Sequence, residues 1–309
     1  MSEDEIILTH ILHCRTIDLV LNKPALTPSQ QKQFEQYKFR RQAGEPLQYI
    51  LGTCNFMGLE LTVNPSVLVP RPETEQLVDA ALKHLTMSSP NVEDPAKGGG
   101  LVGDPNMAIR ILDLGTGSGN IAIALAKFLP QSKIVSIDIS AQAIEVARAN
   151  AQKHGVENCI EFIQGDIFTS LRGARKGDAA ISERTTNSVE IASPAARNDM
   201  LFDLVISNPP YIPTNQLSSL PQDVRHEPAK ALDGGEDGLS FYRIIIKYTP
   251  CLLRSGACLM MEFGDGQAEA VKKLVEAQKA FSGIEIFQDL AGRDRIIKAV
   301  VILRPRLPC

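Results

Sequence analysis

The tetrapeptide from Asn208 to Tyr211 carries the clearest chemical meaning in the chain, and it follows a short apolar run at 201–207. The consecutive prolines Pro209 and Pro210 fix the backbone in an extended form, so the Asn208 side chain and the Pro209 carbonyl are rigid hydrogen-bond acceptors. A planar –NH2 group has two donors and would satisfy both acceptors, while the Tyr211 ring can stack on the planar target. The alternative is a proline-rich exit from a strand that has no chemical role.

The segment from Asp113 to Asn120 is a glycine-rich turn that follows another apolar run. Glycines let a backbone turn sharply and approach a ligand without a Cβ atom in the way. A dinucleotide fingerprint would need a glycine where Asn120 stands, so nicotinamide binding is disfavoured. A different nucleotide site and a plain tight turn both remain as alternatives. As a cofactor site, the turn would use five consecutive residues: Gly115, Thr116, Gly117, Ser118 and Gly119.

Two aspartates stand at the ends of the next two expected strands. Asp138 lies where a carboxylate at the edge of a sheet can accept both hydroxyls of a ribose. The alternative role for Asp138 is a helix N-cap, although Ser140 is an equally good cap. Asp166 can accept from an adenine amino group while Ile167 or Phe168 covers the ring, and a turn-forming aspartate is the alternative. The two aspartates therefore extend the predicted nucleoside site beyond the glycine turn.

These residues need a scaffold, which the apolar pattern from residue 109 onward predicts. Short apolar runs alternate with helical patterns, as in βαβ units that build a parallel sheet covered by helices on both faces. The fold class is therefore α/β, with the candidate residues at the ends of strands. The expected strands are 109–113, 134–138, 160–163, 202–207 and 257–263, with helices at 120–128, 141–153, 238–253 and 267–279 and a terminal hairpin at 284–288 and 296–303.

The N-terminal part has a different pattern. Residues 4–43 show apolar positions at helical spacing, interrupted by prolines, and predict a small helical bundle. Residues 48–69 are rich in β-formers and predict a hairpin that links two domains. We place these domains at 1–70 and 71–309. The polar segments 88–106 and 172–198 do not fit a packed core and are predicted to be mobile surface insertions.

Composition limits the classes of protein that fit. The chain is 44% hydrophobic and 22% charged, and no run approaches the eighteen or so apolar residues that a membrane span requires. The acidic N-terminus lacks the basic region of a secretory signal, so a cytoplasmic location is expected. The six cysteines include no CxxC pair or metal-ligand spacing, and no metal site is expected. The net charge of −4 argues against stable binding of nucleic acid.

Taken with further motifs, the chain closely resembles the release factor glutamine methyltransferases, the HemK/PrmC family. The resemblance covers nearly the whole chain apart from the two polar insertions. Besides the glycine turn and the Asn-Pro-Pro-Tyr tetrapeptide, it is carried by the segments Gly44–Ile50, Val67–Glu75, Glu227-Pro228 with Ala231-Leu232, and Gly234–Leu239.

The resemblance implies a seven-stranded, Rossmann-like class I methyltransferase domain and an N-terminal helical domain that engages a peptide chain release factor. It implies S-adenosyl-L-methionine as the methyl donor, held by 115–119, Asp138, the residue after Asp166, and Asn208. Residues 208–211 would then clasp the glutamine of a Gly-Gly-Gln loop, whose side-chain amide nitrogen receives the methyl group. We expect the enzyme to be a monomer.

Two details of the resemblance stay open. The family often has an aromatic residue where this chain has Ile167, so Phe168 is the candidate to cover the adenine ring instead. The segment 70–75 is either a loop that closes over the methionine end of the cofactor, with Arg71 and Glu73 as polar contacts, or a structural clasp between the domains.

The main alternative function is that of a nucleic-acid amino-methyltransferase, because adenine and guanine amino groups present the same planar –NH2 group. Such enzymes must grip a strand and flip a base, and this acidic chain has no evident basic recognition domain. A non-catalytic cofactor-binding protein is a third class. That class would be expected to have lost some of Asp138, Asn208 or the glycines, and all are present.

Overall fold

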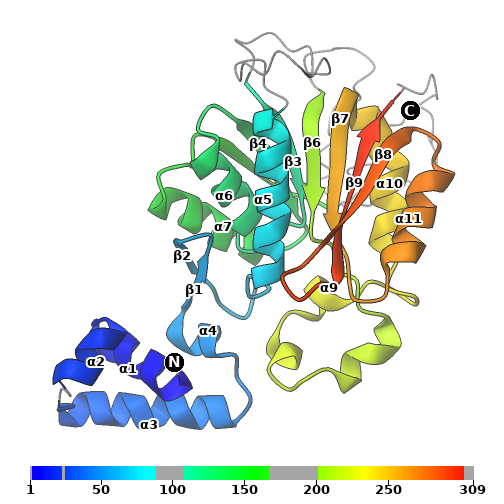
Figure 1. The fold of residues 1–309 in the computed structure, drawn as a ribbon. Helices are drawn as coiled ribbons and strands as arrows, with labels where there is room; N and C mark the ends of the chain where they lie inside the picture. The colour runs from blue at the N-terminus through cyan, green and yellow to red at the C-terminus, as the bar shows by residue number, and fades with distance from the viewer. Residues whose placement is uncertain (1, 23–24, 88–107, 167–200, 303–309) are drawn as a thin grey trace.

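The computed structural model describes residues 2–22, 25–87, 108–166 and 201–302, and a seven-stranded sheet forms its centre (Figure 1). The strand order is β5-β4-β3-β6-β7-β9-β8, in which the first five are parallel and the last two form an antiparallel hairpin. This confirms the predicted α/β fold. The strands are β3 (Arg110–Leu114), β4 (Lys133–Asp138), β5 (Ile160–Gln164), β6 (Phe202–Ser207), β7 (Leu253–Glu262), β8 (Phe281–Gln288) and β9 (Asp294–Val301).

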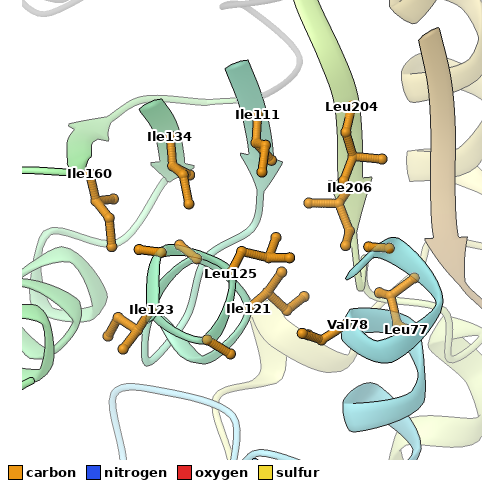
Figure 2. Packing of buried hydrophobic residues seen from close by; sticks show 14 of the residues in the cluster. Leu77, Val78, Ile111, Ile121, Ile123, Leu125, Ile134, Ile160, Leu204 and Ile206 are labelled. Atoms are coloured by element: carbon orange, nitrogen blue, oxygen red, sulfur yellow. The ribbon is translucent and has the colours of Figure 1, made fainter. Parts of the chain in front are cut away.

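Helices cover both faces of this sheet because successive strand residues point to opposite sides. Ile111 of β3 packs with α5, α6 and α7, whereas the next residue, Leu112, packs with α10 and α11. Figure 2 shows the first of these cores, in which Leu77 of α5 and Leu125 of α6 lie against the strands. The helices are α5 (Pro72–Met87), α6 (Asn120–Phe128), α7 (Ala141–Lys153), α10 (Ser240–Leu252) and α11 (Ala268–Ala277).

The N-terminal part contains α1 (Glu3–Leu12), α2 (Thr16–Asn22), α3 (Pro28–Gln42) and α4 (Leu47–Leu51), followed by a hairpin of β1 (Thr53–Phe56) and β2 (Leu59–Thr62). Capping boxes begin α1 at Ser2 and α3 at Thr27. The bundle and the hairpin agree with the prediction. Figure 1 shows this part beyond the end of the sheet at which the parallel strands finish.

The structure corrects the prediction at two helices. Residues 48–52 were expected to belong to the hairpin, but residues 48–51 lie in α4, where Tyr49 and Ile50 are buried, and Gly52, at φ 76°, ends the helix. Helix α5 was not predicted. It begins at Pro72, so most of the segment 70–75 lies in its first turn. Elsewhere, the observed bounds agree with the predicted ones to within a few residues.

An irregular segment, residues 208–239, joins β6 to α10 at the carboxyl end of the sheet. It contains the 3-10 helices η3 (Thr214–Ser219) and η4 (Val224–His226) and the single turn α9 (Ala229–Leu232). Among the described residues, no helix combines the length and the apolar character that crossing a membrane requires. The predicted insertions 88–106 and 172–198 lie outside the described residues.

Candidate active site

A cavity of about 480 Å³ lies at the carboxyl ends of β3, β4, β5 and β6. This is the edge of an open α/β sheet at which ligands bind, and the volume is in the range of small-molecule sites. Six residues predicted from the sequence line the cavity together: Gly115, Gly117, Asp138, Asp166, Asn208 and Pro210.

The glycine turn presents bare backbone to this cavity. Gly115 and Gly117 have φ values of +79° and +55°, which residues with side chains rarely adopt. Apart from the two chain neighbours of each glycine, no described residue has an atom within 4 Å of a Cβ added there. The Gly117 N–H donates to Asp138 Oδ2 at 2.8 Å, and the Ser140 N–H donates to Asp138 Oδ1 at 2.9 Å. Each oxygen of a carboxylate can accept a further bond. The turn and Asp138 therefore form a cradle that fits a nucleoside with a ribose diol.

The other residues of the turn, Thr116, Ser118 and Gly119, pack against the neighbouring elements. Gly119 has φ +83°, and a Cβ there would lie 3.1 Å from that of Ala147, so this glycine lets α6 approach α7. Thr116 and Ser118 are buried at 1% exposure, and the Thr116 hydroxyl lies 3.1 Å from that of Ser136. Thr116, Ser118 and Gly119 are thus close to the cavity without lining it.

Asp113 is a buried acid beneath the turn. Its carboxylate is fully buried and accepts from the Ser136 hydroxyl at 2.8 Å. Burial raises the pKa of Asp113 to about 6, and the negative charge of Asp138 adds to this, while hydrogen bonds from Thr116 and Ser136 oppose it. Burial also raises the pKa of Asp138 against the hydrogen bonds from its neighbouring backbone.

Two walls of the cavity were not predicted as site residues. One is the linker after the hairpin, through Ser66, Val67 and Leu68, and the other is the segment around α9, from Pro228 to Ala231. Both segments are far in sequence from the strand ends, so the sequence does not indicate that they lie beside the cavity. Ile139, which follows Asp138, is 51% exposed and also lines the cavity. Ile167 and Phe168, the predicted adenine contacts, lie outside the described residues.

An ion pair joins these two walls. Arg71 forms it with Glu227, whose side chain is 2% exposed and also accepts from the Val69 N–H at 3.1 Å. Burial raises the pKa of Glu227, while the Arg71 charge opposes this shift. Arg71 and Glu227 both lie within 71–309, so this ion pair leaves both interpretations of the segment 70–75 open.

The Asn-Pro-Pro-Tyr segment leaves β6 at the mouth of the cavity. Asn208 and Pro210 line the cavity, and Pro209 between them is buried. The Asn208 Nδ2 donates to the Thr74 hydroxyl at 2.9 Å, which in turn donates to Glu262 at 2.7 Å. This chain of contacts was missed, because residues so distant in sequence carry no shared pattern.

Tyr211 is partly buried, and its carbonyl accepts from Gln267 Nε2 at 2.9 Å. A Cβ added to Gly264 would lie 2.8 Å from the Tyr211 ring, so that glycine makes room for the ring. Burial raises the pKa of Tyr211 to about 12. The phenol is therefore neutral at physiological pH.

Comparisons with known proteins agree with this fold. Residues 105–247 match the family model described as a methyltransferase domain, and residues 2–52 match that of the PrmC N-terminal domain. The human methyltransferase 10 domain containing protein superposes with a TM-score of 0.51 at 14% identity, over 86% of this chain and 97% of that one, which shows the fold. The protein is an S-adenosylmethionine-dependent methyltransferase of class I.

Two curated relatives are more similar in sequence. A release factor glutamine methyltransferase of Moorella thermoacetica is 39% identical over 274 residues, which cover 89% of this chain and 81% of that protein. Another, of Geobacter sulfurreducens, is 38% identical over 298 residues, covering 96% and 87%. The chain belongs to the release factor glutamine methyltransferase family, which confirms the resemblance in its motifs.

Proposed function

We propose that this protein transfers a methyl group from S-adenosyl-L-methionine to the side-chain amide nitrogen of the glutamine in a Gly-Gly-Gln loop of a peptide chain release factor. The observation that carries the proposal is the orientation of Asn208, which lines the cavity while its Nδ2 donates to Thr74. Its carbonyl oxygen is thus left to accept an N–H from a substrate amide. The names of the relatives support the choice of substrate.

The cradle at the glycine turn would hold the cofactor. Gly115 and Gly117 allow close approach of the backbone, Asp138 would accept the ribose hydroxyls, and Asp166 would accept from the adenine amino group. Ile139 offers exposed apolar surface beside Asp138 for the adenine ring. When bound, the cofactor supplies an electrophilic methyl group on a sulfonium.

The residues of the protein must then make a poor nucleophile react. An amide nitrogen is weakly nucleophilic because its lone pair is delocalised into the carbonyl, so holding it in attack geometry is the main contribution. The Asn208 carbonyl oxygen and the Pro209 carbonyl would accept its two N–H groups. These acceptors also stabilise the positive charge that develops on nitrogen in the transition state. The Tyr211 ring would pack against the planar amide of the substrate glutamine.

We further infer a division of roles between the domains. Residues 1–70 would recognise the release factor, and residues 71–309 would bind the cofactor and carry out the transfer. The linker residues from Ser66 to Leu68 belong to the first part but line the cavity in the second. Recognition and catalysis would therefore meet at this linker.

The test is intact-mass analysis of a purified release factor after incubation with the protein and S-adenosyl-L-methionine. We expect a mass gain of one methyl group, mapped by fragmentation to the glutamine of the Gly-Gly-Gln loop. The matched control is the same factor with that glutamine changed to glutamate, which has the same shape but lacks the N–H groups for Asn208 and Pro209. A methylated glutamate variant would contradict the amide clasp, and nucleic acid should then be tested as the substrate.

A further inference from the structure

Thr74 connects the side chains of Asn208 and Glu262, which come from two different strand ends. Thr74 lies in the first turn of α5 and is 1% exposed, whereas Glu262 ends β7 and is 2% exposed. The Thr74 hydroxyl donates to Glu262 Oε2 at 2.7 Å and accepts from Asn208 Nδ2 at 2.9 Å. The buried hydroxyl thus has a donor partner on one side and an acceptor partner on the other.

This arrangement has a fixed polarity. A hydroxyl has a single O–H donor, and here the Glu262 carboxylate takes it. Towards Asn208, the Thr74 oxygen can then act only as an acceptor. The Asn208 amide must therefore turn its Nδ2 to Thr74, and its carbonyl oxygen lies on the other branch of the amide group. The reversed amide would place an oxygen against the oxygen of Thr74.

We propose that Thr74 and Glu262 are positioning residues that hold the Asn208 amide with its carbonyl oxygen available to the substrate. This inference rests on the proposed function, because only a substrate with an –NH2 group needs an acceptor from Asn208. A reversed Asn208 would offer N–H donors to the donors of a glutamine side chain. The same Asn208 would then suit a carboxylate better than an amide, so the two residues also determine specificity.

The polarity depends on the charge of Glu262. Burial, the largest influence, raises the pKa of Glu262 to about 7. The Glu73 charge acts in the same direction, while hydrogen bonds from Thr74 and Asn208 and the Arg295 charge oppose it. Two tyrosines also face this residue, since the Glu262 charge raises the pKa of Tyr211 and of Tyr242, whose hydroxyl donates to the Glu262 carbonyl at 2.8 Å. Glu262 therefore titrates near neutral pH.

Protonation of Glu262 removes the constraint on Asn208. A protonated carboxyl can donate to the Thr74 oxygen, and the Thr74 O–H is then free to donate to the Asn208 carbonyl. The raised pKa means that the carboxylate is present above about pH 7 and is lost below it. Turnover should consequently fall as the pH decreases through this range.

The first experiment compares Thr74→Val, which keeps the shape but removes the hydroxyl, with Thr74→Ser, which keeps the hydroxyl. We expect Thr74→Val to lower kcat about tenfold or more, with the dissociation constant for S-adenosyl-L-methionine within about twofold of wild type. Thr74→Ser should restore most of the turnover. The matched control is Thr249→Val, because Thr249 is also fully buried but donates only to the Ile245 carbonyl of its own helix. Normal turnover in a folded Thr74→Val variant would overturn the proposal.

The second experiment follows kcat against pH in wild type and in Glu262→Gln. Glutamine can accept from the Thr74 hydroxyl through its carbonyl oxygen but cannot be protonated near neutral pH. We expect wild type to lose turnover below about pH 7 and Glu262→Gln to lack this acid limb. An unchanged acid limb in Glu262→Gln would show that another group titrates, and it would contradict the role of Glu262.

The third experiment needs no release factor. The side-chain amide signals of Asn208, identified in nitrogen-15 NMR spectra by their loss in Asn208→Ala, should shift with pH near neutrality and should change in Thr74→Val. Signals that respond to neither change would overturn the network whatever the substrate is. If they respond but wild type methylates no release factor, the proposed function fails and the positioning of Asn208 stands.

Discussion

At the scale of single residues, Asp138 tests the assignment of the cofactor cradle. We expect Asp138→Ala to weaken binding of S-adenosyl-L-methionine by roughly tenfold or more, because charge-assisted hydrogen bonds contribute about 1.5–3 kcal/mol. Titration calorimetry measures the dissociation constant directly. The control is Asp79→Ala, which removes an exposed carboxylate that pairs with Lys83 on α5. An unchanged dissociation constant in a folded Asp138→Ala protein would refute the ribose assignment.

The Asn208 side chain tests the catalytic step. We expect Asn208→Ala to reduce turnover by more than about a hundredfold, since removing one orienting group in a catalytic site typically costs roughly 2.7–4 kcal/mol of barrier. Cofactor binding should decrease less, because the cradle at Gly117 and Asp138 is intact. Single-turnover kinetics with the release factor separates the two effects. Near-normal turnover in this variant would exclude the amide clasp.

Asp113 makes stability depend on pH. Its folded pKa of about 6 lies above the ordinary value of 3.8, so the folded state holds this proton more tightly than the unfolded state does. The stabilisation is present below the unfolded pKa and is lost as the pH rises through about 6. Urea unfolding between about pH 4 and pH 7 should thus show a smaller decrease in the free energy of unfolding for Asp113→Asn than for wild type. Equal slopes in the two proteins would contradict this account.

At the scale of elements, prediction from sequence succeeded where a local pattern determines the structure. Helix α7 has its apolar residues at helical spacing and Ser140 as its N-cap, and it was predicted with its observed bounds. Helix α5 has the same kind of signal in Leu77, Val78 and Ala81, but its first turn was interpreted as a loop motif. Helix α4 gives almost no signal, because five residues form a helix there only through burial of Tyr49 and Ile50.

In the candidate site too, local patterns could be predicted from sequence and long-range contacts could not. The strand ends could be predicted from sequence, because each follows an apolar run, and this located Gly115, Asp138 and Asn208 at one sheet edge. The contacts between Arg71 and Glu227 and between Thr74 and Glu262 could not, since they join segments 156 and 188 residues apart. Only the packing of α5 and the linker against the sheet brings such residues together.

Asn150 tests how the hairpin is joined to the glycine turn. This fully buried residue of α7 accepts from the Thr62 N–H at 2.7 Å, and its Nδ2 donates to the carbonyls of Thr62 and Ser118, both at 2.9 Å. We expect Asn150→Ala to lower the free energy of unfolding by about 1–3 kcal/mol, because buried polar backbone groups lose their partners. Asn158→Ala, at an exposed position, is the control. Equal thermal stability of the two variants would show that this connection contributes little.

At the scale of the whole molecule, the linker between the hairpin and α5 contacts both of the predicted domains. Val63, Val67 and Val69 are buried against α7, and the Tyr49 hydroxyl donates to the Val67 carbonyl at 2.5 Å. The linker is thus held from both sides while Ser66 and Leu68 line the cavity. A boundary at residues 70 and 71 divides the chain between its elements but cuts through the wall of the cavity that we propose as the cofactor site.

Two truncated proteins test whether the linker is part of the cofactor site. A protein of residues 47–309 keeps α4, the hairpin and the linker, and we expect it to bind S-adenosyl-L-methionine within a few-fold of the full chain. It should methylate the release factor with a higher KM, because α1 to α3 are absent. A protein of residues 71–309 loses one cavity wall and the Val69 contact to Glu227, so its cofactor affinity should fall by more than about tenfold. Circular dichroism must first show that both are folded, and calorimetry then gives the affinities. Equal affinities in the two proteins would mean that the linker is no part of the cofactor site.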